Sequence, residues 1–100
     1  MIVSDKRIMV IGGTGALGTA LTDRWCGDNE VLVFSRNEHK QEDMKRQYPN
    51  VLYRIGDVKD KGSILRTIHE FKPDIIVNTA AMKTVWVAQD NPYETILTNI

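Results

Sequence analysis

Residues 8–18 read IMVIGGTGALG, and this stretch decides the fold. Four uninterrupted apolar residues are typical of a strand that is covered on both faces, as in a parallel sheet. Gly12, Gly15 and Gly18 follow at a spacing of three, and apolar residues then recur at helical spacing to about Trp25. A strand, a glycine-rich turn and a helix in direct succession are how a βαβ unit begins.

The same alternation of strands and helices continues along the chain. Short apolar segments predict further strands at residues 31–34, 51–55 and 75–77, and helices are predicted over residues 38–48 and 60–71. Asn91, Pro92 and Glu94 suit the N-cap, first and third positions of a fourth helix. Right-handed crossovers then predict a partial Rossmann-type, doubly wound parallel sheet of about four strands in the order 3-2-1-4. Left alone, its fourth strand would present an open edge where a fifth strand should pair, which would invite aggregation.

Composition excludes several classes of function. Thirteen Lys and Arg balance thirteen Asp and Glu, so no basic stripe points to nucleic acid. The apolar runs are too short to span a bilayer, which makes a cytoplasmic protein the default expectation. Cys26 has no partner cysteine, and His39 and His69 lack a third ligand, so we expect neither a disulfide nor a metal site. Both histidines are interpreted as surface residues of their helices.

The glycine turn is the motif that carries chemistry. Gly12 permits a tight turn, Gly15 lets the backbone approach a diphosphate, and Gly18 allows the helix to pack closely on the strand. Backbone N–H groups at the positive end of the helix would face the phosphates. The alternative is a glycine-rich turn without a ligand. The cofactor-binding residues predicted in this segment are Gly12, Thr14, Gly15, Ala16, Leu17 and Gly18.

The end of the second strand indicates which dinucleotide would bind. A carboxylate there would hydrogen-bond the ribose hydroxyls of NAD, but this chain has Ser35, Arg36 and Asn37. A guanidinium and a hydroxyl suit the 2′-phosphate of NADP, and one charged hydrogen bond contributes roughly 1.5–3 kcal/mol. The sequence therefore predicts NADP, with a solvated surface arginine as the alternative.

Two further segments follow strands at the same edge of the sheet. Asp57 can accept a hydrogen bond from adenine with Val58 against the ring, although a plain Asx turn explains Asp57 equally well. The small residues after the fourth strand would let the backbone run beside the cofactor, or would serve close helix packing. In this segment we predict contacts from Asn78, Ala80 and Ala81.

These residues resemble the extended short-chain dehydrogenase/reductase superfamily. The resemblance is carried by the glycine turn, by Gly56-Asp57-Val58 and by Asn78-Thr79-Ala80-Ala81. Residues 34–44 (FSRNEHKQEDM) and 80–85 (AAMKTV), with residues 91–94 and 98–100, are similar to UDP-N-acetylglucosamine 4,6-dehydratases of polysaccharide biosynthesis. The chain departs from that subgroup at Thr84, Trp86 and Gln89, where the subgroup has His, Pro and an acidic residue.

The resemblance implies a reaction on a UDP-sugar such as UDP-N-acetylglucosamine. The sugar is oxidised transiently at C4, water is eliminated across C5 and C6, and hydride returns to C6, with inversion of C5 in some members. Lys83 would lie near cofactor and substrate, unless it is a solvated lysine. The superfamily's Tyr-x-x-x-Lys pair does not occur in residues 1–100, so we expect no catalytic residue here.

We therefore interpret residues 1–100 as the amino-terminal part of an NADP-binding Rossmann domain, without the substrate domain and inactive alone. The full-length protein is expected to be a homo-oligomer. Two other interpretations stay open: a nucleotide-sugar epimerase or 4-keto-reductase with the same front half, and a non-catalytic NADP-binding sensor.

Overall fold

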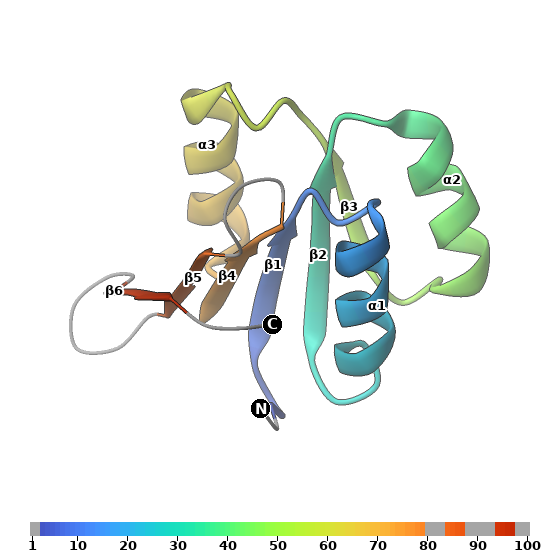
Figure 1. The fold of residues 1–100 in the computed structure, drawn as a ribbon, viewed down its shortest axis with the longest axis horizontal. Coiled ribbons are helices and arrows are strands. Elements are labelled where there is room, and N and C mark those ends of the chain that lie inside the picture. Colours follow the sequence, from blue (N-terminus) through green and yellow to red (C-terminus); the bar gives the residue numbers. More distant parts are fainter. Residues whose placement is uncertain (1–2, 80–83, 88–93, 98–100) are drawn as a thin grey trace.

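The computed structural model describes residues 3–79, 84–87 and 94–97 of the chain. The predicted alternation of strands and helices is confirmed as far as residue 78 (Figure 1). The strands are β1 (Arg7–Ile11), β2 (Glu30–Ser35), β3 (Leu52–Ile55), β4 (Ile75–Asn78), β5 (Thr84–Val87) and β6 (Glu94–Leu97). The helices are α1 (Ala16–Trp25), α2 (Glu38–Gln47) and α3 (Lys61–Phe71).

The strands form one sheet in the order β3-β2-β1-β4-β5-β6. The first four are parallel, which confirms the predicted Rossmann-type order 3-2-1-4. Central β1 pairs on both sides, with Val10 opposite Val33 of β2 and Val77 of β4. The strand order reverses at β1, and in such sheets ligands bind outside the carboxyl ends of the strands at that point.

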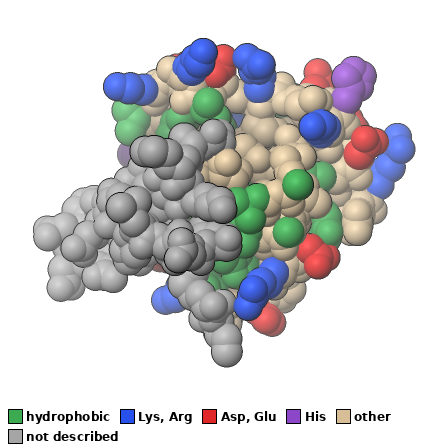
Figure 2. All heavy atoms as spheres, in the orientation of Figure 1, with side chains coloured by type: hydrophobic (Ala, Val, Ile, Leu, Met, Phe, Trp, Pro, Cys, Tyr) green, Lys and Arg blue, Asp and Glu red, His purple; other side chains and the backbone are tan. Residues whose placement is uncertain are grey.

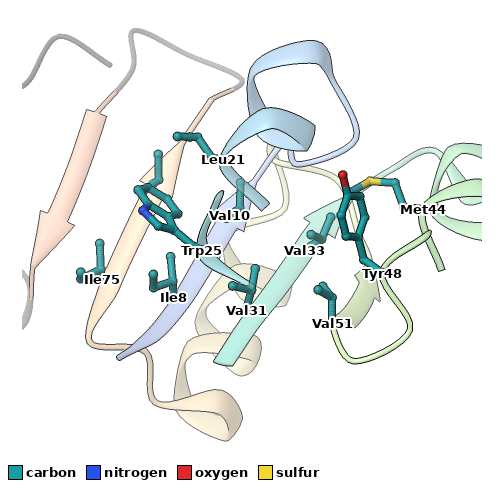
Figure 3. Close-up of a cluster of buried hydrophobic side chains, with 11 residues drawn as sticks. Ile8, Val10, Leu21, Trp25, Val31, Val33, Met44, Tyr48, Val51 and Ile75 are labelled. Carbon is teal, nitrogen blue, oxygen red and sulfur yellow. The ribbon is translucent and has the colours of Figure 1, made fainter. Parts of the chain in front are cut away.

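Continuous apolar strands are needed here because helices cover both faces of the sheet. Successive side chains of a strand point to opposite faces, so Ile8 and Val10 pack under α1 and α2, whereas Met9 and Ile11 pack against α3. Figure 3 shows the first of these layers, with Trp25 of α1 and Tyr48 after α2 closing over β1 and β2. Each fully buried apolar side chain contributes roughly 1.5–3 kcal/mol.

The prediction of a helix that begins at Asn91 is wrong at residues 94–97, the part of the predicted helix that the structure describes. Residues 91–93 lie outside the described part of the chain, and Glu94–Leu97 is strand β6. β6 pairs with β5, which pairs antiparallel with β4 and covers the expected open edge. An N-cap contributes only about 1 kcal/mol to the stability of a helix. The unpaired main-chain N–H and C=O groups along the edge of β4 need hydrogen-bond partners, which a neighbouring strand supplies. β-branched residues such as Thr84 and Val85 also favour strands.

The surface carries charges of both signs. In Figure 2 the Lys, Arg, Asp and Glu side chains are interspersed around the rim of the visible face. Within residues 3–79, 84–87 and 94–97, no helix has the length and apolar character needed to cross a bilayer.

Candidate functional site

A cleft of about 660 Å³ opens at the carboxyl ends of β1, β2 and β3. It brings together the turns that follow these three strands and the first residues of α2. Predicted residues from each of the three turns meet in this cleft, although they are distant in sequence. Of the glycine turn only Gly12 and Thr14 line it, and Gly15, Ala16, Leu17 and Gly18 do not. Its lining consists of Gly12, Thr14, Ser35, Arg36, Asn37, Glu38, His39, Asp57, Val58 and Lys59.

The turn between β1 and α1 is built on glycine for two separate reasons. Gly12 has φ of 77°, a left-handed conformation that L side chains rarely adopt, and its N–H donates to the Phe34 carbonyl at 2.8 Å. At Gly18 a Cβ would lie 2.4 Å from the Cα of Gly13, a backbone atom that cannot swing away. The predicted roles of Gly12 in the turn and Gly18 in packing therefore have a structural basis.

At Gly15, by contrast, neither the backbone conformation nor the neighbouring atoms require a glycine. Its φ of −74° and ψ of 176° suit any residue, and a Cβ would meet only the Gly12 carbonyl oxygen at an ordinary 3.6 Å. Gly15 is also the N-cap of α1, which has no side-chain hydrogen bond to its first turn. First-turn amides that no side chain caps, together with the helix dipole, are the features that favour a phosphate group at a helix N-terminus.

Thr79, which directly follows β4, bonds carbonyl groups at the end of β1 and in the turn. The Thr79 N–H donates to the Ile11 carbonyl at 2.9 Å, and its hydroxyl lies 2.8 Å from that oxygen and 3.0 Å from the Gly12 carbonyl oxygen. Asn78 lies beside Ile11 in the β1–β4 register. Thr79 was predicted only as one of the small residues of segment 78–81, and its hydrogen bonds to these carbonyl groups were not predicted. Ala80, Ala81 and Lys83 lie outside the described residues.

At the end of β2, the predicted residues divide between exposed and buried positions. Arg36 has 81% of its side chain exposed and lies 3.7 Å from a carboxylate oxygen of Asp57. Ser35 is 4% exposed, and its hydroxyl accepts from Gln41 Nε2 at 2.8 Å. Asn37 caps α2, its side-chain oxygen accepting from Lys40 N–H at 3.0 Å. Only Arg36 of these three is free to reorient toward a ligand.

Asp57 forms the Asx turn that the sequence left as an alternative. Its Oδ1 accepts from Lys59 N–H at 2.9 Å, while Oδ2 faces Arg36. Val58 beside it is an exposed apolar residue on the cleft wall.

Sequence reasoning missed several residues around the cleft. Glu38, His39 and Lys59 line it, although His39 was interpreted only as a helix surface residue. Gln41 was missed as well, yet its position is in phase with Met44 and Tyr48 on the buried side of α2, a signal that periodicity offered. No group of three or more metal-ligating side chains occurs in the part of the chain that the structure describes.

A parallel sheet in the order 3-2-1-4, with a glycine-rich turn after β1 and a cleft at the carboxyl ends of its strands, is the architecture of a Rossmann domain, the dinucleotide-binding class of fold. The comparison with known families makes this more particular. The chain belongs to the family described as "Polysaccharide biosynthesis protein", whose model matches residues 8–100. This confirms the resemblance to the nucleotide-sugar branch of the short-chain dehydrogenase/reductase superfamily.

Curated relatives include enzymes that act on UDP-sugars. The UDP-N-acetylglucosamine 4,6-dehydratase (inverting) of Campylobacter jejuni is 37% identical over 102 residues, which cover 97% of this chain and 30% of the relative. The UDP-glucose 4-epimerase of Rickettsia felis is 36% identical over 104 residues, covering 96% of this chain and 30% of the relative. The chain thus spans about 30% of the length of these relatives.

Solved structures show the same fold. The Bordetella bronchiseptica enzyme WbmG, crystallised with NAD and also with NAD and UDP, superposes with a TM-score of 0.68 at 29% identity, over 89% of this chain and 27% of WbmG. Pen from Bacillus thuringiensis superposes with a TM-score of 0.62 at 29% identity, over 68% of this chain and 22% of Pen.

Proposed function

We propose that this chain is the NADP-binding portion of a nucleotide-sugar 4,6-dehydratase that acts on a UDP-sugar such as UDP-N-acetylglucosamine. Residues 1–100 would then form the amino-terminal part of its dinucleotide-binding domain. The observation that carries the proposal is the cleft that Gly12 and Thr14 of the glycine turn line together with Arg36, beside a helix α1 whose N-cap Gly15 makes no side-chain hydrogen bond. The relationship to the Campylobacter jejuni dehydratase supports the reaction class.

Different residues of the site bind different parts of the dinucleotide. Amides of the first turn of α1 hold the diphosphate where Gly15 leaves space, Arg36 and Ser35 bind the ribose 2′-phosphate, and Asp57 and Val58 flank adenine. When bound, the dinucleotide supplies reversible hydride acceptance at the sugar. The remaining residues assigned to the dinucleotide are Gly12, Thr14, Ala16, Leu17, Gly18, Asn37, Asn78, Ala80, Ala81 and Lys83, the last also close to substrate.

The preference for NADP follows from the charges at the end of β2. WbmG binds NAD, but this chain carries Ser35-Arg36-Asn37 where a carboxylate would bind the ribose hydroxyls of NAD. A 2′-phosphate must draw Arg36 away from Asp57. That pair is long and exposed, so it is worth at most about 1 kcal/mol, whereas a charge-assisted hydrogen bond contributes roughly 1.5–3 kcal/mol. The 2′-phosphate is therefore expected to replace Asp57 as the partner of the Arg36 guanidinium.

Calorimetric titration of the intact protein with NADP⁺ and with NAD⁺ tests this assignment. Arg36→Ala should weaken NADP⁺ binding about tenfold or more and leave NAD⁺ binding nearly unchanged. Arg46→Ala is the matched control, because Arg46 is 83% exposed on α2 and does not line the cleft. Equal losses for the two dinucleotides in Arg36→Ala would contradict the assignment.

The reaction is tested separately, with the full-length protein and UDP-N-acetylglucosamine. The expected product has lost the mass of one water, without added reductant. The fragment of residues 1–100 should show no turnover, because it has no Tyr-x-x-x-Lys pair.

A second candidate is a nucleotide-sugar epimerase, which the Rickettsia felis relative favours. Its product would keep the mass of the substrate and differ only in stereochemistry. NADP binding without turnover of any UDP-sugar by the full-length protein would instead indicate a sensor module.

A further inference from the structure

Gln41 is a buried amide on a helix that is otherwise strongly polar. Its side chain is 2% exposed, and Nε2 lies 2.8 Å from Ser35 Oγ, 3.2 Å from the Ser35 carbonyl oxygen and 3.0 Å from the Arg54 carbonyl oxygen. One side chain of α2 thus joins the ends of β2 and β3, where these strands meet the cleft.

The geometry fixes which way this amide faces. Carbonyl oxygens only accept hydrogen bonds, so the end of Gln41 that meets Ser35 O and Arg54 O must be the NH₂ group. Ser35 Oγ, at 2.8 Å from the same nitrogen, is therefore an acceptor in this contact. The proton of the Ser35 hydroxyl remains available to an acceptor oxygen in the cleft that Ser35 lines.

A glutamine is not what packing alone would select at this position. Met44 and Tyr48 occupy the same buried side of α2, and an apolar residue at position 41 would complete their stripe without the cost of burying an amide. The Ser35 carbonyl is also bonded without Gln41, because Gly56 N–H donates to it at 3.0 Å. Replacing Gln41 would therefore mainly remove hydrogen bonds to the Ser35 hydroxyl and to the Arg54 carbonyl.

We propose that Gln41 is a positioning residue for the ribose 2′-phosphate of the dinucleotide: it fixes the end of β2 and holds the Ser35 hydroxyl as a donor toward that phosphate. The inference rests on the proposed NADP-binding function and adds a second determinant to Arg36. It makes dinucleotide choice depend on a residue that never contacts the ligand.

The test is the ratio of the dissociation constants for NAD⁺ and NADP⁺, measured by calorimetry on the intact protein. Gln41→Met should lower this preference for NADP⁺ about tenfold, with NAD⁺ affinity changed by about twofold at most. Ser35→Ala should lower it similarly, and the double variant should lower it no further than either single one, because Gln41 acts through Ser35.

Thr67→Val is the matched control for loss of a buried hydrogen bond. The Thr67 hydroxyl is fully buried in α3, donates to the Ser63 carbonyl at 2.9 Å and does not line the cleft. This variant should lose stability and keep the wild-type preference. A merely structural role of Gln41 would make Gln41→Met behave in the same way.

The outcomes separate the inference from the function beneath it. Wild-type protein that binds neither dinucleotide, or prefers NAD⁺, overturns the proposed NADP function and this inference with it. A wild-type preference for NADP⁺ that persists in Gln41→Met overturns the inference alone. If Gln41→Met does not fold, Ser35→Ala decides, since it keeps both carbonyl contacts of Gln41, and an unchanged preference in it overturns the proposal.

Discussion

The N-terminus of α1 differs from those of α2 and α3 in how its first turn is satisfied. Asn37 and Asp60 cap α2 and α3 with their own side chains, which accept from Lys40 and Ser63 N–H groups at 3.0 and 3.1 Å. Gly15 offers α1 no such cap. Free amides at a helix N-terminus are a cost to stability that an anion can remove. Side chains of the chain itself therefore cap α2 and α3, whereas no side chain caps α1.

What holds the α1 turn in place comes from elsewhere in the chain. Thr79, directly after β4, bonds the carbonyl groups of Ile11 and Gly12, and the missing Cβ of Gly18 lets α1 pack directly on Gly13. These contacts hold the turn in place, while the first turn of α1 has no side-chain cap. This is the preorganisation that lowers the cost of binding.

The largest expected effect on stability concerns the packing of α1. Gly18→Ala should lower the free energy of unfolding by about 3 kcal/mol, because its Cβ would overlap Gly13 backbone. Gly27→Ala is the control, since a Cβ there has no atom within 4 Å and should change stability little. Urea denaturation of the intact protein measures both. Equal effects would show that α1 is not held by this close contact.

A smaller loss is expected when the hydrogen bonds of the Thr79 hydroxyl are removed. Thr79→Val keeps the shape of the side chain and deletes its hydroxyl, so unfolding should become easier by about 1–2 kcal/mol. Thr19→Val deletes a hydroxyl whose contact is a long 3.9 Å to Met44 Sδ and should cost less. A larger cost at Thr19 would refute the role given to Thr79.

The caps of the other two helices should each contribute about 1 kcal/mol. Asn37→Ala and Asp60→Ala remove the side-chain acceptors and should lower the free energy of unfolding by that amount, whereas Gly15→Ala removes no cap. The same denaturation series checks this difference. If Gly15→Ala destabilises as much as the other two, the contrast between the helix ends is wrong.

The smallest effect is a pH dependence at the far end of α3. The Arg54 guanidinium, which donates to Glu70 at 2.7 Å, holds the pKa of Glu70 below its ordinary value of 4.5. The lowered pKa gives stability that is present above pH 4.5 and is lost as the pH falls through the folded-state value. The pair is exposed, so the loss should be small, and Glu70→Gln should remove it from the pH profile of thermal unfolding. A profile that Glu70→Gln leaves unchanged would contradict this.

The sequence predicted the parallel core because strong signals act there over short distances. An apolar run ending in Gly12, Gly15 and Gly18 specifies strand, turn and helix, and Asp60 marks the start of α3 where it was expected. The segment after β4 was mispredicted beyond residue 93, because helix-start signals at Asn91 and Pro92 say nothing of the strand edge nearby.

The sequence singled out residues whose type carries its own chemistry, such as Arg36, which lines the cleft in the structure. Roles that depend on distant partners were missed. Thr79 acts on carbonyl groups of Ile11 and Gly12, and Gln41 acts between β2 and β3. Such contacts depend on the topology of the sheet, which no local pattern of residues records.

The most direct test of the central claim is to give α1 the cap that it lacks. Gly15→Asp fits the extended backbone there and supplies an acceptor like that of Asp60, so stability should stay the same or rise by a few tenths of a kcal/mol. The same carboxylate fills the phosphate space with negative charge, so binding of NADP⁺ to the intact protein should weaken about 100-fold or more. Unchanged NADP⁺ affinity in a fully folded Gly15→Asp protein would contradict the account.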